Sequence, residues 1–228
     1  MGLYLNPNAD AFQMGLNTEI YVDKSLILSE LNKLVGSQGN FVCMSRPRRF
    51  GKSLLVSTLK AYFKGKKELF NGLAIDGLVT EWAEYPVFHL DFNGVDFTQE
   101  GVLDNRINKW LSDYETIYGR NPNSLNQGDR FSDLLKAAHQ QTGRRAVVLI
   151  DEYDKPLLDV LDTGFSTIVD GEKRLLEDHH RNILKGFYSV FKGADEHLQF
   201  VLLTGVTKFS QVSVFSGFNQ PKDISLDG

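Results

Sequence analysis

Apolar positions along the chain alternate between short continuous runs and stripes with helical spacing. Continuous runs of β-branched and aromatic residues are typical of strands that are buried on both faces. Four such runs predict strands, and the third is expected to be central: NFVCM (40–44), YPVFHLDF (85–92), RRAVVLIDEYD (144–154) and LQFVLLTGVTKFS (198–210). Because helical stripes separate these runs, the pattern favours an α/β fold with a mostly parallel sheet and helices on both faces.

The stripes predict five main helices. They cover residues 25–35, 54–65, 106–119, a segment through Phe131, Leu134, Leu135 and Ala138, and 172–193. In the third helix, Trp110, Tyr114 and Tyr118 share one face with Ile107 and Leu111. Aromatic residues at this spacing are far more often core than cofactor contacts. We therefore expect this face to pack against the sheet.

The segment SRPRRFGKS, residues 45–53, joins the first predicted strand to a helix. Gly51, Lys52 and Ser53 match the end of the phosphate-binding pattern G-x-x-x-x-G-K-[ST], whereas Arg46 stands where the first glycine is expected. Unpaired amides at a helix N-terminus attract phosphate, Lys52 can bridge terminal phosphates, and Ser53 can ligate Mg²⁺. Alone, the match is weak, and a basic solvent-exposed loop is the alternative.

Two adjacent acids, Asp151 and Glu152, end the third predicted strand. Asp151 can hold Mg²⁺ directly or through water, while Glu152 is placed to orient and deprotonate an attacking water. A solvated turn at the end of a strand is the alternative. The strand–loop–helix context and the two matches together favour a nucleotide site.

Composition excludes several other classes of function. A chain of 228 residues with a net charge of -4 suits one globular domain without a global basic field for nucleic acid. Its single cysteine, Cys43, excludes an intramolecular disulfide and is expected in the core of a strand. The five histidines lack metal-ligand spacing. With no apolar run of membrane-spanning length and no signal peptide, we expect a cytoplasmic protein and no membrane partner.

Longer motifs resemble those of the AAA-ATPase-like family of bacteria and archaea. They are YVDKS (21–25), RPRRFGKS (46–53), LIDEYDKPL (149–157), LTGVTKFS (203–210) and FSGFNQPKDISLD (215–227). The resemblance implies a P-loop ATPase domain over residues 1–228, of the type in which the sensor strand lies between the P-loop strand and the Asp-Glu strand. The family's own loop also reads Arg-Pro-Arg-Arg-Phe before Gly-Lys-Ser, which accounts for Arg46.

By this resemblance, the cofactors are ATP and Mg²⁺. The implied catalytic residues are Lys52, Glu152 and Thr204, and the implied metal ligands are Ser53 and Asp151. The implied nucleotide-binding residues are Arg46, Pro47, Arg48, Arg49, Phe50, Gly51, Lys52, Ser53 and Leu54.

Family members typically continue into a region that resembles a PD-(D/E)xK nuclease. We therefore expect this chain to be truncated before a helical lid and that effector region; the alternative is that the lid and the effector lie elsewhere. DNA and a second copy of the chain are further candidate partners. Three classes of function stay open: hydrolysis coupled to the effector or to remodelling of a partner, a nucleotide-gated switch, and a basic-loop nucleic-acid-binding module. The complete set of Lys52, Ser53, Asp151 and Glu152 favours the first.

Several residues keep two or three interpretations at this stage. Thr204 either contacts the attacking water or γ-phosphate, or caps the turn before Gly205. Asp154 either supports the site or forms a turn before Pro156. Asp23 lies in a segment that passes the adenine in related ATPases, but a helix cap is the safer interpretation.

Lys208 either reaches phosphate or is a surface lysine. Arg48 and Arg49 either contact phosphate, act on the nucleotide of a neighbouring subunit, or face solvent.

Overall fold

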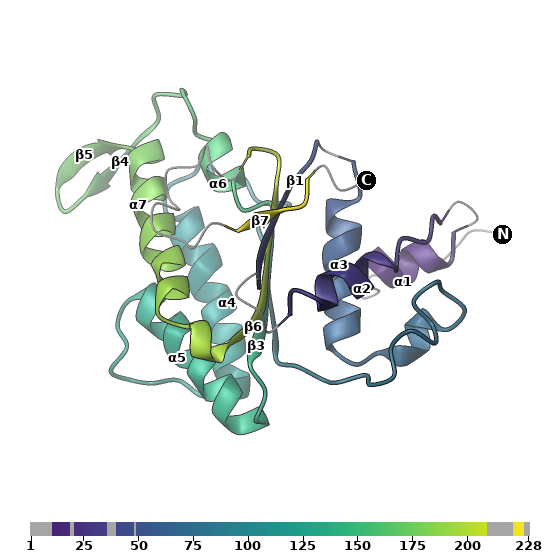
Figure 1. The fold of residues 1–228 in the computed structure, drawn as a ribbon. Helices are drawn as coiled ribbons and strands as arrows, with labels where there is room; N and C mark the ends of the chain where they lie inside the picture. The colour runs from purple at the N-terminus through teal and green to yellow at the C-terminus, as the bar shows by residue number, and fades with distance from the viewer. Residues whose placement is uncertain (1–10, 19–20, 36–39, 48, 209–220, 226–228) are drawn as a thin grey trace.

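Five parallel strands form the central sheet of the computed structural model, which describes residues 11–18, 21–35, 40–47, 49–208 and 221–225 (Figure 1). The strand order is β2-β3-β6-β1-β7, and every neighbouring pair is parallel. β6 therefore lies between β1 and β3, as the additional-strand arrangement requires. The strands are β1 (Phe41–Ser45), β2 (Val87–Asp91), β3 (Ala146–Asp151), β6 (Leu198–Gly205) and β7 (Lys222–Asp223).

Both faces of the sheet are buried, which explains why its strands are continuous apolar runs in the sequence. Along β3, Val148 and Ile150 belong to one core, whereas Val147 and Leu149 belong to the other. All four side chains are fully buried. The alternation follows from the period of two residues in a strand.

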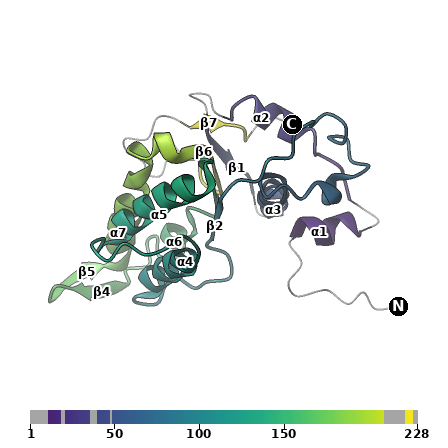
Figure 2. The ribbon, with the colours of Figure 1, turned by 90° about the horizontal axis from the view of Figure 1, so that it is seen from below.

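Two layers of helices cover these faces (Figures 1 and 2). α1, α2 and α3 lie on one side of the sheet, and α4, α5 and α7 lie on the other, so the predicted α/β architecture is confirmed. The expected core face of α4 is also confirmed, with Ile107, Trp110 and Leu111 buried. The helices are α1 (Ala11–Leu16), α2 (Ile27–Asn32), α3 (Lys52–Phe63), α4 (Val102–Tyr118), α5 (Gln127–Thr142), α6 (Lys155–Leu158) and α7 (Leu176–Tyr188), with 3-10 helices η1 (Lys67–Phe70), η2 (Ser189–Lys192) and η3 (Asp195–His197).

Two predicted helices are much shorter in the structure, whereas α3 and α4 begin two and four residues before their predicted starts. The helix expected over 25–35 is only α2, and the helix expected from Glu172 begins at Leu176. Residues Glu172–Leu175 instead form β5, which pairs antiparallel with β4 (Ser166–Val169). Asp170 and Gly171 connect the two strands, with φ values of 52° and 80°. An Asp-Gly pair of this kind favours a two-residue hairpin turn, and this local signal prevailed over the apolar stripe that follows.

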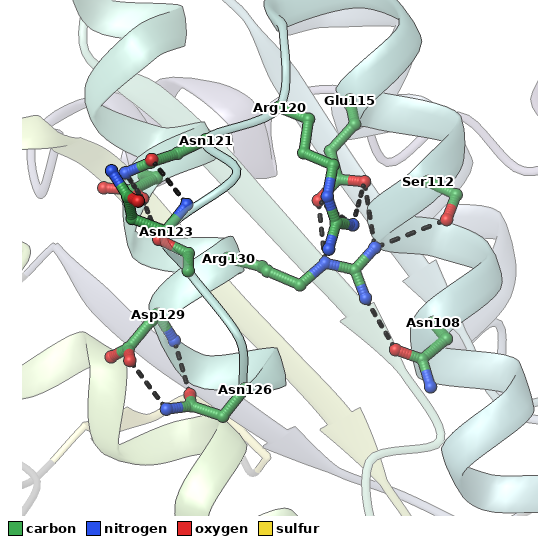
Figure 3. Close-up of polar contacts among 11 residues, drawn as sticks. Asn108, Ser112, Glu115, Arg120, Asn121, Asn123, Asn126, Asp129 and Arg130 are labelled. Atoms are coloured by element: carbon green, nitrogen blue, oxygen red, sulfur yellow. Dashed lines mark hydrogen bonds and ion pairs between the residues drawn. The ribbon is translucent and has the colours of Figure 1, made fainter.

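A buried arginine ties α4 to α5 (Figure 3). Arg130 is only 7% exposed, and its Nε and Nη2 atoms lie 2.7 and 2.9 Å from the two carboxylate oxygens of Glu115. Its Nη1 donates to Asn108 at 2.7 Å. The hydrogen bonds from Arg130 are the main reason that the pKa of Glu115 lies below its usual value. This bidentate pair satisfies a charge that would be costly to bury alone.

We expect Glu115→Gln to lower the free energy of unfolding at pH 7 by about 1.5–3 kcal/mol, because it removes charge-assisted hydrogen bonds. The pKa of Glu115 is depressed by folding, so its contribution is present above the ordinary value of 4.5 and is lost as pH falls through the folded value. The difference between parent and variant should therefore shrink in acid. Urea denaturation at pH 7 and below pH 4 checks this, with the exposed Glu172→Gln as the control.

Candidate nucleotide-binding site

The predicted site residues come from three neighbouring strands and meet at one edge of the sheet. The P-loop segment follows β1, the Asp-Glu pair ends β3, and Thr204 lies near the end of β6. In open α/β sheets, ligands bind outside the carboxyl ends of the strands. Because β6 lies between β1 and β3, the order of the strands brings both halves of the motif to this edge.

The loop after β1 turns without a glycine at Arg46. Two later positions have left-handed backbone, Arg49 with φ of 69° and Gly51 with φ of 77°. Arg46 is outside the left-handed region, and its amide donates to Gly205 O at 3.1 Å. The turn therefore needs glycine at Gly51, where a side chain would be strained, and does not need it at Arg46.

Lys52 points back into this loop and toward β3. Its Nζ donates to Arg46 O at 2.8 Å and to Pro47 O at 3.3 Å, and it lies 3.1 Å from Glu152 Oε1. The Lys52 side chain is 3% exposed and that of Glu152 is 13% exposed. A lysine ammonium has three donors, so these three acceptors match its capacity.

Glu152 is held in an unusual state for a carboxylate. Burial raises its pKa, and the hydrogen bond and charge of Lys52 oppose this effect without cancelling it. Its backbone is left-handed, with φ of 55°. Strain of this kind is concentrated at functional sites. A raised pKa makes the Glu152 carboxylate a stronger base, which suits it to accept a proton.

Asp151 is fixed by two neighbours. Its Oδ1 accepts a short hydrogen bond from Thr204 Oγ1, and its Oδ2 accepts from Asn93 Nδ2 at 3.2 Å. Both Asp151 and Thr204 are buried. The hydroxyl of Thr204 therefore points toward the carboxylate of Asp151 at the end of β3. The sequence prediction missed Asn93, although its position directly after β2, the neighbour of β3, places it at the same edge of the sheet.

A cavity of about 530 Å³ adjoins the loop at Arg46, Phe50 and Gly51. Its walls come from the N-terminal segment, from β1 and from α3, and most of its lining side chains are apolar. Phe50, 62% exposed, lies at this cavity. The lining residues are Gly15, Thr18, Tyr21, Val22, Lys24, Ser25, Ile27, Met44, Arg46, Phe50, Gly51, Leu54, Leu55 and Thr58.

The N-terminal segment is held in place by Asp23, which is not the helix cap that we expected. The N-cap of α2 is Leu26, without a side-chain cap. Asp23 instead accepts from the backbone amides of Ser25 at 2.8 Å and Ala74 at 2.6 Å. Partial burial acts to raise the pKa of Asp23, but these hydrogen bonds lower it overall. The segment that borders the cavity is thereby tied to the chain after η1.

The remaining predicted residues lie at the surface or outside the described chain. Arg49 and Lys208 are exposed, and Ser53 is exposed in the first turn of α3. Arg48 lies outside the described residues. The guanidinium of Arg46 donates through Nε to Ser225 O at 3.2 Å, after β7.

The donor set fits a magnesium ion. Mg²⁺ prefers oxygen ligands, keeps several waters, and is usually bound by one or two protein groups together with substrate phosphates. The Ser53 hydroxyl and the Asp151 carboxylate are groups of this kind. Elsewhere, the described part of the chain holds no cluster of three or more His, Cys, Asp or Glu side chains that could bind a metal.

Comparison with known proteins decides the family. Residues 11–215 match the model of the AAA-ATPase-like family, described as "Predicted AAA-ATPase". The chain belongs to this family. The AAA-ATPase-like assignment agrees with the strand order and with the positions of both halves of the motif, and it implies nucleotide binding.

A curated relative is the "Uncharacterized protein in vnfD 5'region" of Azotobacter chroococcum mcd 1, which is 38% identical over 207 residues. The match covers 91% of this AAA-ATPase-like chain but only 37% of the relative, so the chain spans about a third of that protein's length. No solved structure matches. None of the helices in the described residues combines the length and the apolar character that a bilayer crossing needs.

Proposed function

We propose that the chain binds ATP with Mg²⁺ at the N-terminus of α3 and hydrolyses it. One observation carries the proposal: Lys52 Nζ and Glu152 Oε1 lie 3.1 Å apart, although they come from opposite halves of the motif. A phosphate-binding lysine beside a partly buried carboxylate with a raised pKa is a combination suited to water attack on a phosphoryl group.

The cavity next to Gly51 is the proposed site of the nucleobase. Its volume of about 530 Å³ is in the range of small-ligand sites, and the apolar lining suits the faces of an aromatic base. Phe50 belongs to the phosphate loop and lines this cavity, where its exposed ring can pack against a bound base. Tyr21 and Ile27 contribute to the wall from the N-terminal segment.

Lys52 binds the terminal phosphates by exchanging acceptors. In the structure its ammonium contacts Arg46 O, Pro47 O and Glu152. Phosphate oxygens are stronger acceptors than carbonyl oxygens, because the hydrogen bond is charge-assisted on both sides. When the Lys52 ammonium binds phosphate, it no longer contacts the Glu152 carboxylate, which becomes free to act on water.

Glu152, once released, takes the proton of the attacking water. Ser53 and Asp151 would hold Mg²⁺, which supplies positive charge to the phosphates as negative charge develops on them. Thr204 and Asn93 keep the Asp151 carboxylate oriented. Lys52 acts in catalysis by stabilising charge on the phosphates, and Glu152 acts as the general base.

The longer relative supports coupling of hydrolysis to something beyond this domain. We propose that the ATPase acts on an effector region in a longer protein, such as a nuclease-like one, or remodels a partner; DNA and a second copy of the chain are candidate partners. An ATP-independent DNA affinity that falls steeply with salt would favour the exposed basic loop at Arg49 instead.

A nucleotide-gated switch is the second candidate. The Lys52–Glu152 ion pair favours it, because binding of phosphate would separate the pair whether or not hydrolysis follows. The rate of ATP turnover distinguishes the two functions, because the switch requires binding and little hydrolysis.

The proposal is tested by calorimetry with ATP and with inorganic tripolyphosphate, both with Mg²⁺, and by phosphate release. We expect ATP to bind more tightly than tripolyphosphate because only ATP fills the apolar cavity. Equal affinities for ATP and tripolyphosphate would show that the cavity does not bind the nucleobase. Binding of ATP without phosphate release would favour the nucleotide-gated switch over hydrolysis. If neither compound bound, the proposal would be refuted.

A further inference from the structure

The turn at the end of β6, residues 205–207, is held by the two residues that follow Glu152. Asp154 Oδ2 accepts from the amides of Val206 at 2.9 Å and Thr207 at 2.5 Å. Tyr153 OH donates to Thr207 O at 2.6 Å, and the Tyr153 amide donates to Thr204 O at 2.9 Å. We call this set of contacts the turn clamp. It joins the end of β3 to the end of β6 directly beside the candidate site.

The other side of the same turn is bonded to the start of the phosphate loop. Ser45 Oγ donates to Thr207 O at 2.8 Å, and the Arg46 amide donates to Gly205 O. The turn thus contacts both halves of the motif: the loop that carries Lys52 and the segment that carries Glu152. A displacement of the turn would change the distance between these halves.

The packing leaves no space for adjustment at Gly205. A Cβ atom there would lie 2.6 Å from Tyr153 Cε1 and 2.7 Å from Asp154 Oδ1, which is far inside van der Waals contact. Asp154 and Tyr153 are 1% and 0% exposed. Glycine at 205 is therefore required by close approach of the clamp, since its φ is outside the left-handed region.

The clamp uses a buried carboxylate without a cationic partner among the described residues. Within the described part of the chain, Asp154 Oδ1 has no hydrogen-bond partner, and Oδ2 accepts only from the two amides. Burying a charge in this way is costly, and a neutral side chain would join the strands at lower cost. Proteins retain energetically unfavourable features of this kind mainly at functional sites, where the position of a side chain matters for activity.

We propose that Asp154 is a positioning residue for the hydrolysis: it fixes the 205–207 turn, and through it the placement of Thr204 and of the phosphate loop relative to Glu152. The inference rests on the proposed function. Both interpretations of Asp154 apply to different parts of the residue. Its backbone forms the turn before Pro156, with its carbonyl accepting from the amides of Leu157 and Leu158, whereas its side chain reaches the 205–207 segment and makes no cap hydrogen bond to α6.

The test is Asp154→Asn, which keeps the shape and one acceptor but removes the charge. We expect kcat to fall by about tenfold to a hundredfold, the scale of a small misplacement of catalytic groups, while the Kd for ATP changes by less than about threefold. Hydrogen exchange of the peptide that contains Val206 and Thr207 should become faster. Gly205→Ala, which forces the clamp apart from the other side, should change kcat in the same direction.

Glu115→Gln is the matched control, because it also removes a buried charge-assisted hydrogen bond but lies between α4 and α5. At an equal loss in Tm, it should leave kcat unchanged. Parental kcat in Asp154→Asn would overturn the positioning role alone, as would an equal loss of kcat in the control. A parent chain that neither binds nor hydrolyses ATP would refute the proposed function, and the positioning role with it.

Discussion

Glu152→Gln should lower kcat for ATP hydrolysis by about a hundredfold or more, the usual scale for removing a positioned general base. Glutamine has nearly the same shape, so the left-handed backbone at this position and the packing around it should be retained. The amide cannot accept the proton of water at neutral pH. The measurement is single-turnover hydrolysis of ATP with Mg²⁺.

The affinity of Glu152→Gln for ATP should be equal to or higher than that of the parent. In the parent, the carboxylate of Glu152 lies 3.1 Å from Lys52 Nζ and competes with phosphate for it. The variant removes this competing negative charge. ATP should therefore stay bound and unhydrolysed, which calorimetry and filter binding would detect.

The pH dependence supplies an independent readout. Burial raises the pKa of Glu152, so the acid limb of kcat/KM should lie above the ordinary glutamate value of 4.5, with activity rising as the carboxyl loses its proton. The limb should be absent from the residual activity of Glu152→Gln. Glu172→Gln, on the exposed β5 strand, is the control. Hydrolysis by Glu152→Gln at the parental rate would make the nucleotide-switch function the better one.

The strands of the sheet could be predicted because burial on both faces forces a continuous apolar run, as in β3. Periodicity could not supply their order. The position of β6 between β1 and β3 came from the family resemblance, and it is this order that brings Lys52 and Glu152 together. Residues far apart in the sequence were thus placed in one site by topology.

The hairpin β4–β5 shows where the pattern misled. An apolar stripe from Leu175 onward predicted a helix, but Asp170-Gly171 had already reversed the chain. The Asn93–Asp151 hydrogen bond was missed for a different reason: it depends on the path of the loop after β2, which no local spacing determines. The turn clamp is also a tertiary feature, because its partners at the ends of β3 and β6 are separated in the sequence by α6, the hairpin and α7.

Lys52→Ala should weaken ATP binding rather than only slow turnover. Lys52 contacts the phosphates in the ground state, so its removal loses a charge-assisted interaction of about 1.5–3 kcal/mol, equivalent to roughly a tenfold to more than a hundredfold rise in Kd. Calorimetry with ATP and Mg²⁺ measures it. Lys64→Ala, just past the other end of α3, is the control for loss of a lysine charge and should leave the Kd unchanged.

The same substitution tests the link between the two halves of the motif. Without Lys52, the carboxyl of Glu152 loses the neighbour that opposes the effect of burial, so its pKa should rise further and its acid limb should shift to higher pH in any residual hydrolysis. Lys52→Ala combined with Glu152→Gln should lose more affinity than the sum of the two single effects, because each single variant already removes the Lys52–Glu152 contact that competes with phosphate, and the sum counts this gain twice. The contradicting result is a Lys52→Ala variant that binds ATP as tightly as the parent and keeps the parental acid limb. Lys52 would then neither hold phosphate nor lower the pKa of Glu152. The assignment of ATP to the N-terminus of α3 would be wrong.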